Sequence, residues 1–353
     1  MANPSDRRRA ARVGSTPAVA PHPATTPATP AVDHLTPGLC LTIAYVTFRQ
    51  NPRFEWFAAS LARELRDTGV NPACLQVVVV DGRLWHDSSA RRIHLADLVG
   101  GRFPLEHVAP KPTVWQGPWR LTSRDYFSAS STRNTALARA RAPHVAFVDD
   151  LSVLMPGWLA AQLDAAARGI VLLGLTDKRL DVTITPAGGY IFADHPAGTD
   201  SRHVRFSGDE APAPGAWLYG GTFSVPLATA LAVNGFDEVC EGIGGEDYDF
   251  GIRVERTRTP IYISRRCATV EDEKAHYTEV ATAIRLDKPW AGPDGPYSSN
   301  ALLHKLSVES RSWTVGNHFN LRELRSSVLS GCGFPIPTEP RTHWVDGQPL
   351  IEM

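Results

Sequence analysis

The sequence has few cysteines, no excess of basic residues and no long apolar segment, and each shortage excludes a class of protein. Its five cysteines among 353 residues lie far apart without a CxxC pair, which excludes a disulfide framework and a zinc cluster. The formal net charge of −1 lacks the basic excess that nucleic-acid binding requires. No stretch reaches the roughly 18 apolar residues of a membrane span. We therefore expect a cytoplasmic protein that acts on small molecules or saccharides.

Residues 1–37 are rich in Pro, Ala, Ser and Thr and lack apolar periodicity. Such a segment cannot bury enough surface to offset the entropy of ordering, which predicts a disordered tail. A transit peptide is the alternative because the segment carries arginine and little acid, although its proline density argues against an amphipathic helix. The apolar run of a signal peptide does not follow the first arginines.

Residues 38–285 alternate between apolar strands and amphipathic helices. The run Leu41–Phe48 predicts a buried strand, residues 53–67 place apolar side chains at helical spacing, and Leu75–Val80 predicts a second strand that ends in Asp81. A third short strand is expected near 105–109. Strand, helix and strand in this order predict a parallel sheet that is covered by helices on both faces.

The rest of the chain continues this alternation until about residue 285. We expect strands near 144–148, 170–175, 216–225 and 261–264, and helices near 130–141, 156–168, 226–233 and 246–256, with irregular strands and loops over 180–215. A Pro/Gly-rich stretch, 288–296, then breaks the pattern. Residues 286–353 are therefore expected to form a helical and irregular extension packed on the main domain.

Polar residues follow three of the expected strands where each strand ends. They are Thr47, Asp81 and the pair Asp149–Asp150. Any one of them has the ordinary explanation of a loop residue or a cap. Ligands of open parallel sheets bind outside the carboxyl ends of the strands, so together these residues indicate one binding edge.

The helix that begins near Gly245 has two distinguishable faces. Glu246 belongs to a charged stripe, whereas Asp247 shares its face with Phe250 and Val254 and is expected to point towards the fold. Acidic residues in a first turn also complement the helix dipole, which suits Glu246. A carboxylate on an apolar face indicates catalysis or metal binding instead. The glycines before it would let a substrate approach the backbone.

Several motifs, taken in order, resemble the family 2 glycosyltransferases, whose fold is of the GT-A type: a mostly parallel, Rossmann-like sheet sandwiched by helices. They are Thr42–Phe48, 78–81, Arg133–Asn134, 147–150, 156–159, Gly220–Gly221, 234–238 and 244–247. The segment 244–250 also resembles the Gly-Gly-Glu-Asp element of the β-1,4-galactosyltransferase and polypeptide N-acetylgalactosaminyltransferase families. The ordered resemblance spans about residues 41–280.

The resemblance implies a site residue by residue. The donor nucleotide would lie near the strand-end and helix-start positions, and the base that takes the acceptor proton would be Asp247. Glu246, Gly245 and Trp217 would contact the acceptor, although Trp217, like Trp115 and Trp119, could equally pack in the core. The implied donor-binding residues are Thr47, Phe48, Asp81, Arg133, Asn134 and Asp149.

The sequence departs from these families at two positions. Leu151 stands where a metal-binding Asp is usual, and Ile243 replaces the Trp before Gly-Gly. Asp150 and His276 remain as candidate ligands for Mn²⁺ or Mg²⁺, and His276 is also only one of twelve histidines. We therefore expect a weakly held metal that is bound mostly through the donor's phosphates.

The function implied is an inverting transfer of a hexose or N-acetylhexosamine from a nucleotide-diphosphate sugar, UDP before GDP, to a hydroxyl of a saccharide or small molecule. A nucleotidyltransferase that makes nucleotide sugars is one alternative, but the first strand lacks the Gly-rich basic loop that binds a triphosphate. A homologue that only binds sugar nucleotides is another, motivated by Leu151. The sequence leaves the donor, the acceptor and the oligomeric state open.

Overall fold

The computed structural model describes most of the chain after residue 33. The described ranges are 34–85, 89–113, 116–118, 125, 127–185, 189–192, 196–198, 200–238, 245–278, 319–334, 344–345 and 348–349. None of the helices in these ranges combines the length and apolar character needed to cross a bilayer.

The first strand, helix and strand form the predicted parallel unit. Every side chain of β1 (Leu41–Thr47) and β2 (Leu75–Asp81) is buried, and the two strands pair in parallel. Between them, α1 (Phe54–Thr68) buries aromatic and aliphatic side chains spaced three or four residues apart, and it ends at Gly69, whose φ of 65° suits glycine. The prediction of a βαβ unit is confirmed.

The main sheet has the strand order β10-β12-β6-β11-β4-β1-β2-β3, with β5 paired to β12 and β9 paired to β6. Strands β1, β2, β3, β4, β6 and β12 run parallel, and β11 inserts antiparallel between β4 and β6. The further bounds are β3 (Leu105–Val108), β4 (His144–Asp149), β5 (Ser152–Leu154), β6 (Val171–Arg179), β9 (Pro196–Gly198), β10 (Glu210–Pro212), β11 (Thr222–Pro226) and β12 (Ile261–Asp272).

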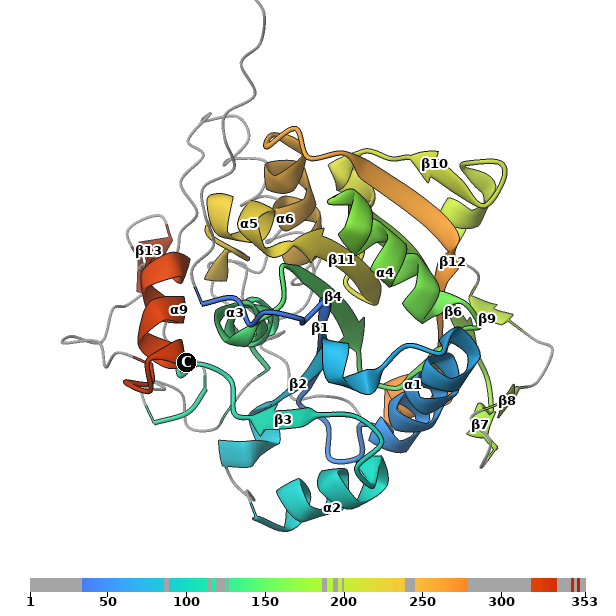
Figure 1. Cartoon of the computed structure of the whole chain (residues 1–353), viewed down its shortest axis with the longest axis horizontal. Coiled ribbons are helices and arrows are strands. Elements are labelled where there is room, and N and C mark those ends of the chain that lie inside the picture. Colours follow the sequence, from blue (N-terminus) through green and yellow to red (C-terminus); the bar gives the residue numbers. More distant parts are fainter. Residues whose placement is uncertain are drawn as a thin grey trace, which may run out of the picture. The chain divides into compact units, whose positions relative to one another are not determined.

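Helices cover both faces of this sheet, as predicted (Figure 1). On one face α1, α2 (Ser89–Val99) and α4 (Trp158–Arg168) enclose a core that includes Phe57 and Trp158. On the other, α3 (Ala129–Arg139), α5 (Leu227–Ala232), α6 (Glu246–Glu255) and α9 (Leu321–Leu329) enclose Phe147, Phe236 and Phe250. The fold is therefore mixed α/β, with a large, mostly parallel sheet between helical layers.

Three elements differ from the sequence-based expectation. Helix α2 was not predicted, because only Leu95 and Val99 of its side chains are buried while Ile93 is exposed, which leaves little periodicity to detect. Strand β12 runs beyond Ser264 to Asp272 through a register shift between Ile263 and Ala268. Strand β11 begins only at residue 222, since 215–217 form the 3₁₀ helix η4.

Part of the expected C-terminal extension lies within the described ranges. Helix α9 packs on α3, where the buried guanidinium of Arg325 donates hydrogen bonds to the carbonyl oxygens of Leu137, Ala138 and Ala140. These carbonyls belong to the last turn of α3 and its end, so Arg325 acts as a C-terminal cap supplied by another helix. The small strands β13 (Trp344–Val345) and β14 (Gln348–Pro349) pair with each other, as do β7 (Thr183–Ile184) and β8 (Tyr190–Ile191). The proposed boundaries at residues 37 and 285 stay predictions.

Candidate active site

The carboxyl ends of β1, β2 and β4 lie side by side in the sheet. Thr47 is opposite Asp81 across the β1–β2 pair, and Val46 is opposite Asp149 across the β1–β4 pair. The polar residues that follow these strands are therefore neighbours at one edge. This is the edge at which open parallel sheets bind ligands.

A buried arginine connects this edge to the first turn of α6. The guanidinium of Arg133, on α3, donates to Asp149 Oδ1 at 3.0 Å through Nη2 and to Glu246 Oε1 at 2.9 Å through Nη1. The side chain of Arg133 is 3% exposed, whereas that of Asp149 is 36% exposed. Arg133 therefore brings the predicted donor end and the predicted acceptor helix together, with Asp149 only partly covered.

The charges around Arg133 shift one another's ionisation. Burial raises the pKa of Asp149 to about 7, although Arg133 opposes this shift. Burial and the adjacent Asp247 raise the pKa of Glu246. Burial alone would lower the pKa of Arg133, but Asp149, Glu246 and Asp247 outweigh it and raise that pKa. The arginine is thus a fixed positive charge, and Asp149 titrates near neutral pH.

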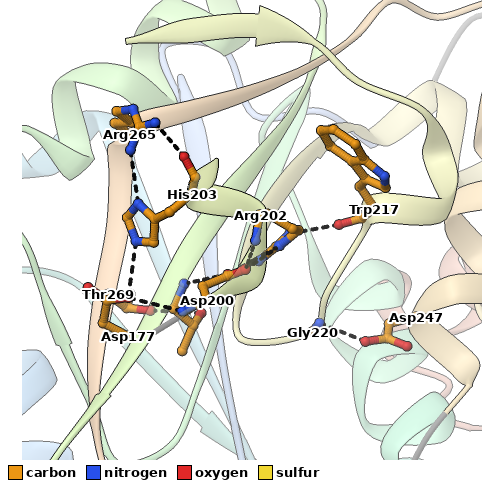
Figure 2. A network of polar contacts seen from close by, with 10 residues as sticks. Asp177, Asp200, Arg202, His203, Trp217, Gly220, Asp247, Arg265 and Thr269 are labelled. Carbon is orange, nitrogen blue, oxygen red and sulfur yellow. Dashed lines mark hydrogen bonds and ion pairs between the residues drawn. The ribbon is translucent and has the colours of Figure 1, made fainter. Parts of the chain in front are cut away.

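Asp247 lies beside this cluster and is held by two backbone amides. The N–H of Gly220 donates to its Oδ2 at 2.9 Å (Figure 2), and the N–H of Tyr248 donates to its Oδ1 at 2.7 Å. Its side chain is only half-buried. The carboxylate is therefore oriented but still reachable from solvent.

The two faces of α6 differ from the sequence-based prediction. Most of the charged stripe is buried in addition to the apolar face, since Glu246, Asp249 and Arg253 are each almost completely covered. Arg253 donates to Asp249 and to the carbonyl oxygens of Val233 and Gly235, so each charge is compensated inside the fold. The apolar face that Asp247 shares with Phe250 and Val254 is buried, as expected, and Asp247 itself is half-buried at the start of that face. Periodicity did not reveal that charges of the stripe also have buried partners.

The glycine pair before β11 lets the chain pass close to the site. A Cβ on Gly220 would lie 2.4 Å from Nη2 of Arg133, and one on Gly221 would lie 2.4 Å from Oγ1 of Thr176. The carbonyl of Gly221 also accepts the N–H of Asp149 at 3.1 Å. Only glycine fits at these positions without displacing a neighbouring side chain.

Asp150 turns away from Asp149 and is engaged by β1 and the loop after it. Its Oδ2 accepts the hydroxyl of Thr47 at 2.7 Å and its Oδ1 accepts Nε of Arg49 at 2.9 Å. Strand β4 ends at Asp149, so Asp150 lies just beyond the strand. Leu151 is fully buried with a φ of 61°, a conformation that branched side chains rarely adopt.

Of the pair Asp149–Asp150, Asp149 offers a divalent cation the more accessible carboxylate. Both oxygens of Asp150 are taken, and the side chain of His276, on α7 (Glu273–Thr278), lies outside the described residues. Within the described part of the chain, no three His, Cys, Asp or Glu side chains gather as a metal-binding set. The residues fit a metal only if the donor's phosphates supply most of its oxygens.

The remaining donor candidates are committed to internal contacts. Asp81 is fully buried and accepts hydrogen bonds from Arg91 and from His107 Nε2 at 3.0 Å; burial opposes its ionisation, but these partners outweigh it and lower its pKa. Phe48 packs over Gly82. The amide of Asn134 exchanges two hydrogen bonds with the backbone of Phe236. Their donor-binding roles stay predictions.

Of the acceptor candidates, Gly245 caps α6 with a φ of 91°, and Trp217 is half-buried on η4. Trp115, Trp119, Ile243 and Gly244 lie outside the described residues.

Two residues near the site were not predicted from the sequence. Glu271, buried near the end of β12, contributes to the raised pKa values of Asp149 and Asp150. Burial, with added repulsion from Glu271, Asp149 and Asp247, raises the pKa of Tyr219. The sequence signal that could have found Glu271 is the mostly apolar run Cys267–Val270 directly before it, which indicates that the strand continues. The predicted strand ended at Ser264 and therefore did not include this run.

Comparison with known proteins gives a family match over part of the chain. Residues 201–280 match the family model of the N-terminal domain of galactosyltransferase, a span that contains Gly220, Glu246 and Asp247. No curated protein matches the sequence.

Solved structures with a similar chain path include TarS of S. aureus and GalNAc-T7. Residues 1–349 of S. aureus TarS in complex with UDP-GlcNAc are 14% identical, with 67% of this chain and 59% of that chain covered and a TM-score of 0.46. TarS itself is 16% identical over 67% of this chain and 37% of that chain, with a TM-score of 0.45. GalNAc-T7 with UDP, GalNAc and Mn²⁺ is 11% identical, with 66% of this chain and 44% of that chain covered and a TM-score of 0.44.

The family match includes both the glycine pair Gly220–Gly221 and the first turn of α6. Glu246, in that turn, is joined to Asp149 at the carboxyl end of β4 by Arg133, and the carbonyl of Gly221 accepts the N–H of Asp149. Residues 201–280 are thus similar to the N-terminal domain of galactosyltransferase, and they belong to a mixed α/β fold whose main sheet is mostly parallel.

Proposed function

We propose that this chain transfers a hexose or N-acetylhexosamine from a nucleotide-diphosphate sugar, UDP before GDP, to a hydroxyl acceptor with inversion. The observation that carries the proposal is the placement of Asp247. Its carboxylate is held at 2.9 Å by the Gly220 N–H, next to the Arg133 that binds Asp149 and Glu246. A basic group and a fixed cation therefore stand together at the strand ends.

In the proposed reaction, the acceptor hydroxyl gives its proton to the carboxylate of Asp247 as its oxygen forms a bond to the anomeric carbon. The bond from that carbon to the donor's diphosphate breaks, and its electron pair leaves on the nucleoside diphosphate. A single displacement of this kind inverts the anomeric configuration. A positioned base typically contributes about 100- to 10,000-fold to the rate.

Charge that develops on the departing diphosphate needs a positive partner. Arg133 supplies one that is buried and held on both sides, so it requires no reorganisation during the reaction. A Mn²⁺ or Mg²⁺ ion, when bound, would supply further positive charge. We propose Asp149 as its principal protein ligand, because Asp149 is the exposed member of the aspartate pair.

A thermal-shift screen of nucleotide sugars with and without Mn²⁺ tests the proposal. A ligand that binds only the folded protein raises the melting temperature, by an amount that follows its concentration relative to Kd. We expect a UDP-sugar to raise it more in the presence of Mn²⁺ than in its absence. A protein that responds to no nucleotide sugar would contradict the proposal.

A binding-only role is the second candidate, favoured by the buried Leu151 at the position of a usual metal ligand. It predicts donor binding without turnover. Hydrolysis of the donor, or transfer to any hydroxyl compound, would exclude it.

A further inference from the structure

A pocket of about 390 Å³ opens where the chain approaches Gly220. We call it the Trp217 pocket. Its walls come from the end of β6, from the 3₁₀ helix η3 (Ser201–Val204) and from η4 with the residues that follow it. The side chains used below are Thr176, Lys178, Arg202, Arg205, Trp217 and Tyr219.

Hydrogen bonds fix the wall of this pocket in place. The carboxylate of Asp200 accepts the backbone N–H of Thr176 at 3.1 Å and the backbone N–H of Arg202 at 2.9 Å. The guanidinium of Arg202 in turn donates to the carbonyl oxygen of Trp217 at 2.7 Å. Figure 2 shows this chain of contacts on the same segment that ends in the Gly220–Asp247 hydrogen bond. The guanidinium of Arg265 also donates to the carbonyl oxygens of His203 and Phe206, on either side of Arg205. The pocket is therefore preorganised.

The cations of the pocket are not equivalent. Arg202 is almost fully buried and is neutralised by Asp200, with Nη2 2.5 Å from Oδ2. Lys178 pairs with Glu273 at 2.9 Å. Arg205 is exposed and lies over the ring of Trp217, 5.3 Å from its centroid, and within the described residues no carboxylate pairs with it. Arg205 thus offers an uncompensated guanidinium at the pocket.

Two aromatic side chains complete the pocket and connect it to the site. Trp217 is half-buried under Arg205, and Tyr219 is 43% exposed. Tyr219 directly precedes Gly220, whose N–H donates to Asp247 at 2.9 Å. Exposed aromatic faces with a few polar groups are typical of small-molecule pockets. Tyr219, at the end of the pocket lining, is therefore one residue away from the backbone group that holds Asp247.

We propose that the Trp217 pocket binds the acceptor, and that this acceptor carries an oxyanion, a carboxylate or a phosphate, which Arg205 recognises. The proposal rests on the proposed function for the role of Asp247. Guanidinium groups match the geometry of carboxylate and phosphate oxygens, and an arginine held over an aromatic ring loses less freedom on binding. The sugar or polyol part of the acceptor would lie along Tyr219, with a hydroxyl directed to Asp247.

Equilibrium binding of three matched probes tests this assignment: glucose, glucuronate and glucose 6-phosphate, measured by NMR titration. We expect the two anionic probes to bind about 10- to 100-fold more tightly than glucose, which is the range for hydrogen bonds to a charged group. Whichever anion binds more tightly identifies the source of the negative charge. In Arg205→Gln this preference should largely disappear.

The matched control is Arg141→Gln, an exposed arginine at the amino end of β4, on the opposite edge of the sheet. It removes the same charge and should keep the preference for the anionic probes. Equal binding of all three probes, no binding of any, or a preference that Arg205→Gln retains would overturn the inference. So would displacement of the anionic probes by UDP, because the pocket would then belong to the donor.

The same samples distinguish a failure of the acceptor assignment from a failure of the proposed function. A UDP-sugar that stabilises the protein while the probes show no preference for anions contradicts only the acceptor assignment. Probe binding that depends on Arg205 without any response to nucleotide sugars contradicts only the proposed function.

Discussion

Replacing Arg133 with methionine should destabilise the protein strongly, because it removes the guanidinium that pairs with a buried carboxylate. Glu246 is 7% exposed on its side chain and loses the Arg133 Nη1 donor at 2.9 Å. Breaking a buried ion pair in this way costs about 3–5 kcal/mol. Asp149 is more exposed, so its share of the loss is small. For a domain of this size, 1 kcal/mol corresponds to roughly 2–4 °C, so the melting temperature should fall by about 6–20 °C.

The loss should also depend on pH, in a direction that follows from the carboxylates. The folded-state pKa values of Glu246 and Asp149 lie above their unfolded values and would rise further without Arg133. Groups of this kind favour folding while protonated, and the stability they contribute is lost as pH rises from about 4 through the folded pKa. The difference between wild type and Arg133→Met should therefore be small near pH 5 and largest above about pH 7.

Thermal and urea unfolding of Arg133→Met and of a control, Arg139→Met, measure this effect. Arg139 lies on the same helix and pairs with Glu106 at 2.9 Å, but its side chain is 27% exposed, so its loss should cost about 0–1 kcal/mol. A loss in Arg133→Met no larger than in the control, or one that is the same at both pH values, would refute the reasoning.

Three further outcomes are expected. Because the pKa of Asp149 is about 7, wild-type stability should decline as pH rises from about 4 to 7, and a melting-temperature profile of Asp149→Asn should show a smaller decline, since the raised pKa of Glu246 still contributes. Activity should fall in excess chelator and return with millimolar Mn²⁺ or Mg²⁺, as a transfer assay with re-added metal would show; full activity in chelator would point to Arg133 as the sole cation. Deletion of residues 1–36 should leave the melting temperature and donor binding nearly unchanged, and a drop of several degrees would show that the segment packs on the domain.

The parts of the fold that the sequence predicted are those set by local burial. Strands β1, β2 and β4 are mostly apolar, and the last residue of each is polar: Thr47, Asp81 and Asp149. A buried polar side chain needs a hydrogen-bond partner, so these residues mark where each strand ends. Because parallel strands align their carboxyl ends, the edge shared by Thr47, Asp81 and Asp149 could be predicted from the apolar runs alone.

What the sequence did not predict depends on contacts between distant residues. Arg133 and Glu246 are 113 positions apart, and only the tertiary fold brings this side chain of α3 to the first turn of α6. Glu271 reaches the site through a register shift within β12, which local patterns do not record. Asp249 and Arg253 are buried as a compensated pair, whereas periodicity assigns charged side chains to the surface.

The side-chain contacts of Asp150 could not be predicted for a similar reason. Its carboxylate is taken by Thr47 and Arg49, which lie about 100 positions earlier in the chain. The sequence therefore identified the aspartate pair but not the division of roles, in which Asp149 is exposed and Asp150 is bound within the fold.

The central claim is that Asp247 takes the acceptor proton, and Asp247→Asn tests it most directly when donor binding and turnover are measured on the same sample. The amide keeps one acceptor for the N–H groups of Gly220 and Tyr248 but has no basicity. The control is Asp97→Asn, the same change at an exposed position of α2. We predict that the Asp247 variant binds the UDP-sugar with little change and loses about 100-fold or more in kcat, while the control keeps both. Turnover above about a tenth of the wild-type rate, with the donor still bound, would contradict the claim.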